Sequence, residues 1–126
     1  MNETLTFPES CVPFNPSPAY LVGPFDVYDR EETLGRELGV YDPNRPDHLH
    51  ELLERYVFPR WEMIGFTANH RNAIKASIGA ALSDPNHDFS RYLQDHDGVC
   101  LPATWRIKDS RQFFLNAHAA VCRRWG

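Results

Sequence analysis

The sequence lacks any apolar run close to the roughly 18 residues that a membrane span requires. It also does not open with the basic stretch and apolar core of a signal peptide. We therefore expect a soluble chain without a membrane partner. Its 126 residues suit one domain, and 42% hydrophobic with 24% charged residues is an ordinary globular composition.

Cysteine is scarce, and the motifs of several catalytic classes are missing. The three cysteines are odd in number and far apart, which argues against a disulfide framework and favours a cytoplasmic location. No G-x-S-x-G nucleophile elbow and no glycine-rich phosphate loop occurs. The sequence thus indicates no cofactor and leans away from an enzyme.

An excess of basic residues is also missing, because the net charge is −4. The charge is uneven: residues 1–63 hold five Lys or Arg and twelve Asp or Glu, whereas residues 64–126 hold eight and five. The two halves can complement each other within the fold or steer a partner. Nucleic-acid binding through the basic half is the weaker alternative, because such proteins usually carry a clear basic excess.

Proline is concentrated near the start, where five of the ten prolines precede Asp26. Proline fixes φ and pushes its predecessor toward extended geometry, so residues 1–25 are predicted to form an extended arm. The arm is apolar, unlike a disordered linker. We expect it to pack on residues 26–126, the single helical domain, or to swap onto a second subunit.

Helical signals run through that domain. Capping and periodicity predict helices near 30–38, from 44 onward, near 60–82 and near 108–124. Residues 99–107 lack helical period and are expected to be an extended connection. The predicted fold is all-α, with four to five short helices in an irregular bundle.

The predicted helix 60–82 contains the most suggestive histidine. Its apolar stripe has steps of three and four residues and includes His70 among Met63, Phe66, Ile74, Ile78 and Ala81. A buried imidazole must find a partner, and the usual outcome is a satisfied core histidine. The alternative is an acid–base site in an interhelical pocket, with His118 or Glu62 as partners.

Two further clusters resemble metal sites. Asp47–Glu54 reads D-H-L-H-E-L-L-E, in which His50 and Glu54 lie one helical turn apart but the second histidine of a zincin is missing. The segment 83–98 holds four aspartates and two histidines. Helix punctuation explains most of them, with Asp84 as a cap before Pro85 and Asp97-Gly98 as a stop. No metal is expected at either cluster, and His50 with Glu54 is the weak candidate.

Aromatic–arginine pairs are the remaining feature: Arg60-Trp61, Trp105-Arg106 and Arg124-Trp125, with Arg71 near the first. Tryptophan and arginine are enriched at the energetic centres of protein interfaces. Tryptophans buried in the core beside incidental arginines are the simpler interpretation. The leading hypothesis is a protein–protein interaction or regulatory module that self-associates or inhibits a partner; the alternative is a metal-assisted or acid–base enzyme.

Overall fold

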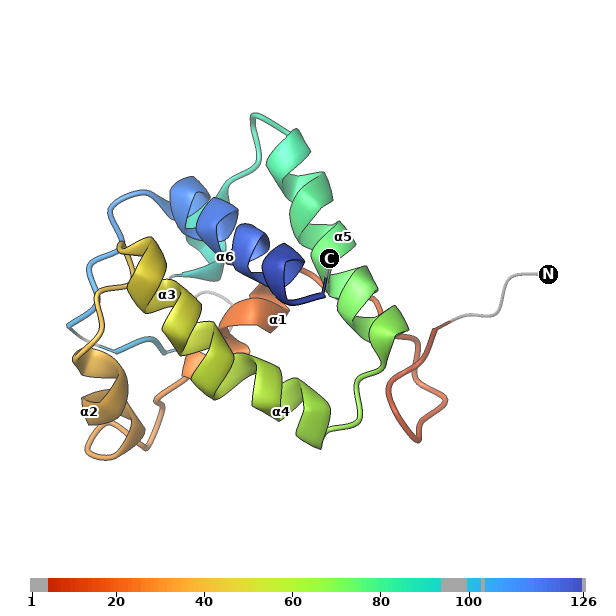
Figure 1. The fold of residues 1–126 in the computed structure, drawn as a ribbon, viewed down its shortest axis with the longest axis horizontal. Helices are drawn as coiled ribbons and strands as arrows, with labels where there is room; N and C mark the ends of the chain where they lie inside the picture. The colour runs from red at the N-terminus through yellow and green to blue at the C-terminus, as the bar shows by residue number, and fades with distance from the viewer. Residues whose placement is uncertain (1–4, 94–99, 103, 126) are drawn as a thin grey trace.

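The computed structural model describes residues 5–93, 100–102 and 104–125 (Figure 1). Within these residues the regular structure is helical, and the only β-type pairing is one isolated bridge between Thr6 and Pro13. The prediction of an all-α fold with four to five short helices is confirmed. None of the helices in the described ranges is long and apolar enough to cross a bilayer.

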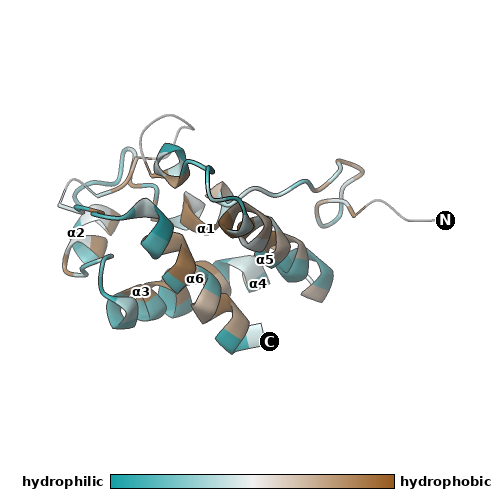
Figure 2. Cartoon of the chain, turned by 90° about the horizontal axis from the view of Figure 1, so that it is seen from above, coloured by the Kyte–Doolittle hydropathy of each residue, from teal (hydrophilic) through white to brown (hydrophobic). Residues whose placement is uncertain are grey.

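The bundle is built around the two longest described helices, which lie in the second half of the chain. The elements in chain order are α1 (Ala19–Val22), η1 (Gly23–Phe25), α2 (Leu34–Gly39), α3 (Pro46–Leu52), η2 (Leu53–Val57), α4 (Phe58–Met63), α5 (Ala68–Ser83), η3 (Phe89–Tyr92) and α6 (Ser110–Trp125). Helix α6 packs against both α5 and α3 (Figure 1). The helices carry apolar and polar stretches side by side, as amphipathic helices do (Figure 2).

The N-terminal arm packs on its own chain through apolar side chains. Phe14, Leu21, Val22 and Phe25 are all buried. The predicted extended conformation is wrong for residues 19–25, which form α1 and η1. The physical reason is that proline also suits a helix start, where its missing N–H costs nothing.

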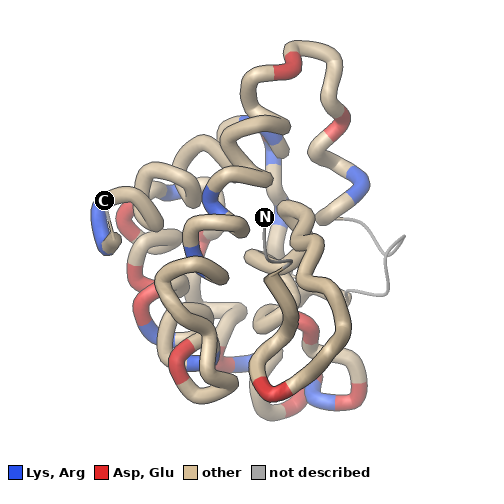
Figure 3. Tube along the Cα trace, turned by 90° about the vertical axis from the view of Figure 1, so that its right-hand side faces the viewer, with Lys and Arg blue, Asp and Glu red and all other residues tan. Residues whose placement is uncertain are grey.

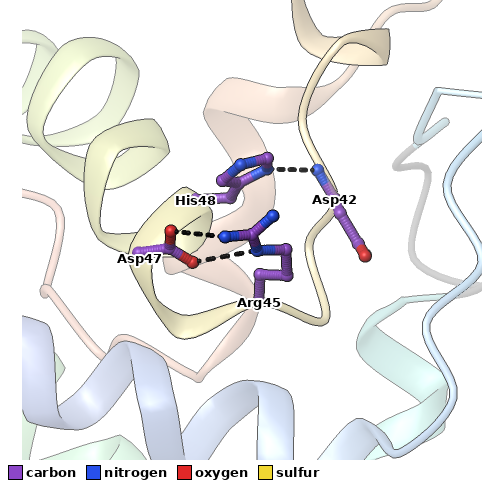
Figure 4. A network of polar contacts seen from close by, with 4 residues as sticks. All are labelled: Asp42, Arg45, Asp47 and His48. Atoms are coloured by element: carbon purple, nitrogen blue, oxygen red, sulfur yellow. Dashed lines mark hydrogen bonds and ion pairs between the residues drawn. The ribbon is translucent and has the colours of Figure 1, made fainter.

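Polar contacts organise the entry to α3 (Figure 4). Arg45 pairs with Asp47 at 2.9 Å, and the Asp42 backbone N–H donates to Nδ1 of His48 at 2.9 Å. Pro46 occupies the first position of the helix, where its missing N–H costs nothing. The preceding helix, α2, begins at Leu34 rather than near residue 30, because residues 28–33 form turns in which Asp29 has a φ of 60°.

Pro59 is accompanied by one widened helical turn between α3 and α4. A proline inside a helix cannot donate to the carbonyl four residues earlier, and its ring clashes with that carbonyl. The chain accommodates it with the π-helical segment η2, in which the Phe58 N–H donates to the Leu53 carbonyl five residues back. Residues 46–63 therefore run on as one bent helical rod.

The predicted single helix 60–82 is wrong, because a turn separates α4 from α5. Gly65 has a φ of +87°, a left-handed conformation that ends α4, and Thr67 is extended and caps α5. Met63 consequently leaves the apolar stripe and is 80% exposed, whereas Phe66, Ile74 and Ile78 are buried as predicted.

The segment after α5 also differs from its prediction. Asp84 follows the C-terminus of α5 rather than starting a helix, and the next helical turn, η3, is capped by Asp88, which accepts from the Ser90 N–H. Arg111 of α6 ties the end of α5 to the loop that follows it, because its guanidinium donates to the carbonyls of Leu82, Asp84 and His87. The predicted stop at Asp97-Gly98 lies outside the described residues.

Candidate functional site

An open, mostly apolar groove lies between the N-terminal arm and α4. Its volume is about 480 Å³. It is lined by residues from the arm, from η1, and from α4 and the turn after it: Phe7, Pro8, Tyr20, Gly23, Pro24, Arg60, Trp61, Ile64 and Phe66. The groove thus joins segments that are about forty residues apart in the sequence.

The arm wall of the groove is held by a tight turn and an aromatic cluster. The Phe7 N–H donates to the Val12 carbonyl at 3.0 Å, closing the turn in which Glu9 has a φ of 56°. Phe14 lies beneath this turn, with its ring centroid 4.9 Å from that of Phe7 and 5.4 Å from that of Tyr20. Glu9 is the single charged residue in residues 5–25, so the wall is held by its aromatic rings rather than by ion pairs. Figure 3 shows how Lys and Arg (blue) and Asp and Glu (red) are distributed along the trace.

The opposite wall carries the rim of the groove. Trp61 is buried and forms part of the floor, while Arg60 and Ile64 are exposed. In the part of the chain that the structure describes, the Arg60 side chain makes no ion pair or hydrogen bond, while its backbone carbonyl accepts from the Ile64 N–H. The unpaired Arg60 guanidinium and the exposed Ile64 side chain therefore both lie at the mouth of the aromatic groove.

A second aromatic–arginine cluster lies behind Trp61, at the end of α6. Trp125 stacks on Trp61, with ring centroids 6.0 Å apart and planes 25° apart. It also packs edge-to-face with Phe58, with ring centroids 4.6 Å apart. The Arg71 guanidinium lies 4.7 Å from the Trp125 ring centroid and also donates to the Phe66 carbonyl. The structure thus brings Trp61, Arg71 and Trp125 together, with Arg71 and Trp125 in a cation–π contact that was not predicted from the sequence.

The third predicted pair lies elsewhere. Trp105 is buried, donates from Nε1 to the Leu38 carbonyl at 2.9 Å, and packs on Phe25 with ring centroids 5.4 Å apart. The Arg106 side chain is exposed, and its backbone carbonyl accepts from the Asn44 amide. Trp105 therefore holds α2 against the connection to α6 and does not join the surface around Trp61.

His70 has fixed partners on both ring nitrogens. Nε2 lies 2.7 Å from the Thr6 carbonyl, which can only accept, so Nε2 carries the proton. Nδ1 accepts from the Thr67 N–H at 3.0 Å as half of a capping box. With the ring buried between Phe14 and Phe66, His70 is a neutral structural histidine that ties the arm to the start of α5.

The acid–base partners proposed for His70 do not approach it. His118 faces Gly79, since a Cβ built there would meet its Nε2 at 3.4 Å, and Gly79 is nine residues along α5 from His70, which is about 13 Å of helix. Glu62 is exposed and lies 3.8 Å from Arg124. Burial and the positive charge of Lys75 hold the pKa of His118 below its usual value.

His50 and Glu54 are adjacent, as their spacing predicts, with 3.7 Å between Nε2 and Oε1. Glu54 is shared with Arg124, whose guanidinium lies 3.6 Å from its other carboxylate oxygen. Among residues 5–93, 100–102 and 104–125, no three His, Cys, Asp or Glu side chains are grouped to hold a metal ion. The pair therefore belongs to a set of polar contacts that links α3, η2 and α6, in which Glu54 and Arg124 form the ion pair.

Sequence reasoning missed the arm wall of the groove and the His70 cap. The apolar residues of the arm were a usable signal for the wall, but their pairing with α4 is a tertiary contact. Thr67-x-x-His70 could also have been recognised as a capping box, with histidine where glutamate is usual.

Comparisons with family models, with curated proteins and with solved structures found no match to this chain.

Proposed function

We propose that this chain is a protein–protein interaction module that receives an apolar segment of a partner in the groove between the arm and α4. The observation that carries the proposal is the open groove itself, in which an aromatic floor meets the unpaired Arg60 and the exposed Ile64. Aromatic residues and arginine are both enriched at the energetically important positions of protein–protein interfaces.

The size of the groove bounds the strength of such binding. A single aromatic side chain of the partner would bury about 150–250 Å², worth roughly 4–6 kcal/mol at 25 cal/mol per Å². Association alone costs a similar amount or more. A stable complex therefore needs further contacts around the groove, and Met63, which is exposed beside Ile64, provides apolar surface for them.

A regulatory role is part of the proposal: by binding an apolar segment of its partner in the groove, the module makes that segment inaccessible to other contacts. Cys11, Cys100 and Cys122 form no disulfide bond among the described residues, which supports placement in a reducing compartment such as the cytoplasm. A second copy of this chain is one possible partner, and the experiment below separates it from a different protein.

The test uses the full chain, purified from its own host and analysed by native mass spectrometry. Ile64→Asp places a charge on the rim of the groove, and Val40→Asp is the matched control because Val40 is exposed on a different surface, beside α2. We expect one partner mass that Ile64→Asp removes and Val40→Asp keeps. A benzophenone side chain introduced at position 64 should cross-link to that same partner.

The outcome that contradicts the proposal is equally specific. Loss of the partner mass with both variants, or its retention with both, would place the interaction elsewhere on the molecule. A chain that stays a monomer without any bound partner in its host would also refute it. A homodimer mass that responds only to Ile64→Asp would identify the partner as a second copy.

A further inference from the structure

The face of α6 that turns toward α5 carries a thiol and an imidazole one helical turn apart. Sγ of Cys122 lies 3.8 Å from Nδ1 of His118 and 4.0 Å from Nε2. Residues four apart project from the same side of a helix, so this contact is set by the backbone of α6. The pair lies apart from the groove described above, because both residues are on α6 and no residue of α6 lines that groove.

The environment keeps His118 neutral and orients its ring. Burial is the larger cause that lowers the pKa of His118, and the nearby Lys75 charge is the second. Nε2 of the ring faces α5, where a Cβ built at Gly79 would lie 3.4 Å away. The other nitrogen, Nδ1, is the one nearer the thiol, and a neutral imidazole can accept a proton there.

The other two cysteines have no such neighbour among the described contacts. Cys11 is exposed in the turn of the arm. Cys100 is half-buried, and its backbone N–H donates to the Asp26 carboxylate. Cys122 is also half-buried, so a small reagent can reach it, and among the contacts given for the described residues its sulfur is the one that lies beside an imidazole. The chain therefore contains its own comparison for thiol reactivity.

We propose that Cys122 is a site of reversible thiol modification by low-molecular-weight disulfides, with His118 as the group that takes the thiol proton. The Cys122 S–H gives its proton to the His118 ring, and the resulting thiolate attacks one sulfur of the disulfide. One S–S bond breaks, a mixed disulfide forms on Cys122, and the displaced thiolate leaves and can take the proton from the imidazolium. No other oxidant or reductant is consumed.

Electrostatics favour this reaction over the binding of a metal cation. The Lys75 ammonium next to the pair stabilises an anionic sulfur and repels a cation. The C-terminal end of α6 opposes a thiolate, but Arg123 and Arg124 in its last turn offset that field. Two ligands from one helix turn also fall short of the four that a tetrahedral zinc site needs.

The test compares two full-length single-cysteine proteins. One carries Cys11→Ser and Cys100→Ser and keeps Cys122; the other carries Cys100→Ser and Cys122→Ser and keeps Cys11. Each is mixed with glutathione disulfide near pH 7, and the mixed disulfide is followed by intact-mass spectrometry. His118→Gln is expected to slow the Cys122 protein at least about tenfold, which is less than the roughly 10²–10⁴-fold that a proton acceptor typically contributes, because part of a free thiol is ionised near pH 7 without help. The same substitution should leave the Cys11 protein within about twofold.

Further measurements keep the test decisive if His118→Gln perturbs the fold. Circular dichroism and thermal unfolding identify that case. The rate–pH profiles of the two proteins with His118 intact then decide: we expect the Cys122 rate to rise at lower pH than the Cys11 rate. Lys75→Gln should slow Cys122 by a smaller factor than His118→Gln. Equal profiles for the two thiols, a Cys122 rate indifferent to His118→Gln, or no adduct on folded Cys122 would overturn the proposal.

Discussion

His70 and His118 stand on α5 and α6, helices of 16 residues each, and the two sites contrast in how far their rings are committed. Both nitrogens of His70 are held by backbone groups inside an aromatic cage. His118 is half-buried, and one side of its ring meets the Cys122 thiol. The contrast teaches that a histidine is structural when its partners are fixed backbone groups, and chemically available when one nitrogen faces a group that exchanges protons.

The largest expected effect is the difference in stability between removing the His70 ring and removing the His118 ring. His70→Ala leaves the Thr6 carbonyl and the Thr67 N–H without partners and opens a cavity beneath Phe14, so we expect it to lower the free energy of unfolding by about 3 kcal/mol. His118→Ala should change that free energy by less than about 1 kcal/mol, because its site is half open. Urea unfolding followed by tryptophan fluorescence measures both.

A double-mutant cycle sharpens this prediction. Thr67→Ala removes the other half of the capping box and should cost about 1 kcal/mol. The double variant with His70→Ala should lose less stability than the sum of the two single losses. Each substitution alone already removes the contact of 2.9 Å between Oγ1 of Thr67 and Nδ1 of His70. Additive losses, or equal costs for His70→Ala and His118→Ala, would contradict the structural assignment of His70.

The two sites each include a glycine, and substituting it should give effects of opposite sign. Gly65, in the turn before the His70 cap, has a φ of +87°, so Gly65→Ala should destabilise the protein by about 1–2 kcal/mol. Gly79, beside His118, is helical and an added Cβ meets only ordinary contact, so Gly79→Ala should stabilise by up to about 1 kcal/mol. Thermal unfolding gives the sign directly; a destabilised Gly79→Ala would mean that His118 cannot yield.

The smallest effect is a pH dependence that belongs to His118. Its pKa in the folded chain is lower than in the unfolded chain, so the unfolded state binds the proton first as pH falls below about 6.5. The free energy of unfolding should therefore decrease as pH falls from 7 toward 5, and His118→Gln should flatten that part of the profile. A profile unchanged by the substitution would show that the ring is not desolvated.

A second, separate loss is expected at more acidic pH. Hydrogen bonds from Asn44 lower the pKa of Asp42, and hydrogen bonds from Ser90 lower that of Asp88. Stability from these carboxylates is present above their unfolded pKa, near 4, and is lost as pH falls through the folded values. His118→Gln should leave this acidic limb in place, which makes it the internal control for the titration.

Local pattern was enough to predict most of the helices. The steps from Phe66 to Ile78 place one face of α5 in the core, and that face is buried as expected. The same periodicity failed at Met63, because Gly65 breaks the helix while the spacing of apolar residues continues through the break. Periodicity reports which face is buried, and it says little about whether the backbone is continuous.

The candidate site was predictable only in part. Trp61, Arg71 and Trp125 were all singled out by residue type, and they do meet, yet Trp105 has the same sequence signature and packs elsewhere. Residue type gives the capacity of a tryptophan for stacking and hydrogen bonding. Its neighbours come from distant segments, and short-range pattern contains no information about those.

The amino-acid sequence by itself determined the all-α class, the apolar character of the arm, and the four-residue spacing that places Cys122 beside His118, because these follow from backbone periodicity and local capping. Only the tertiary structure decided that the Thr6 carbonyl, 64 residues away, would occupy Nε2 of His70, and that Phe7 and Tyr20 would face Trp61 across a groove. The physical reason is chain closure. A long-range contact forms where all buried surfaces fit at once, and no single segment specifies that fit.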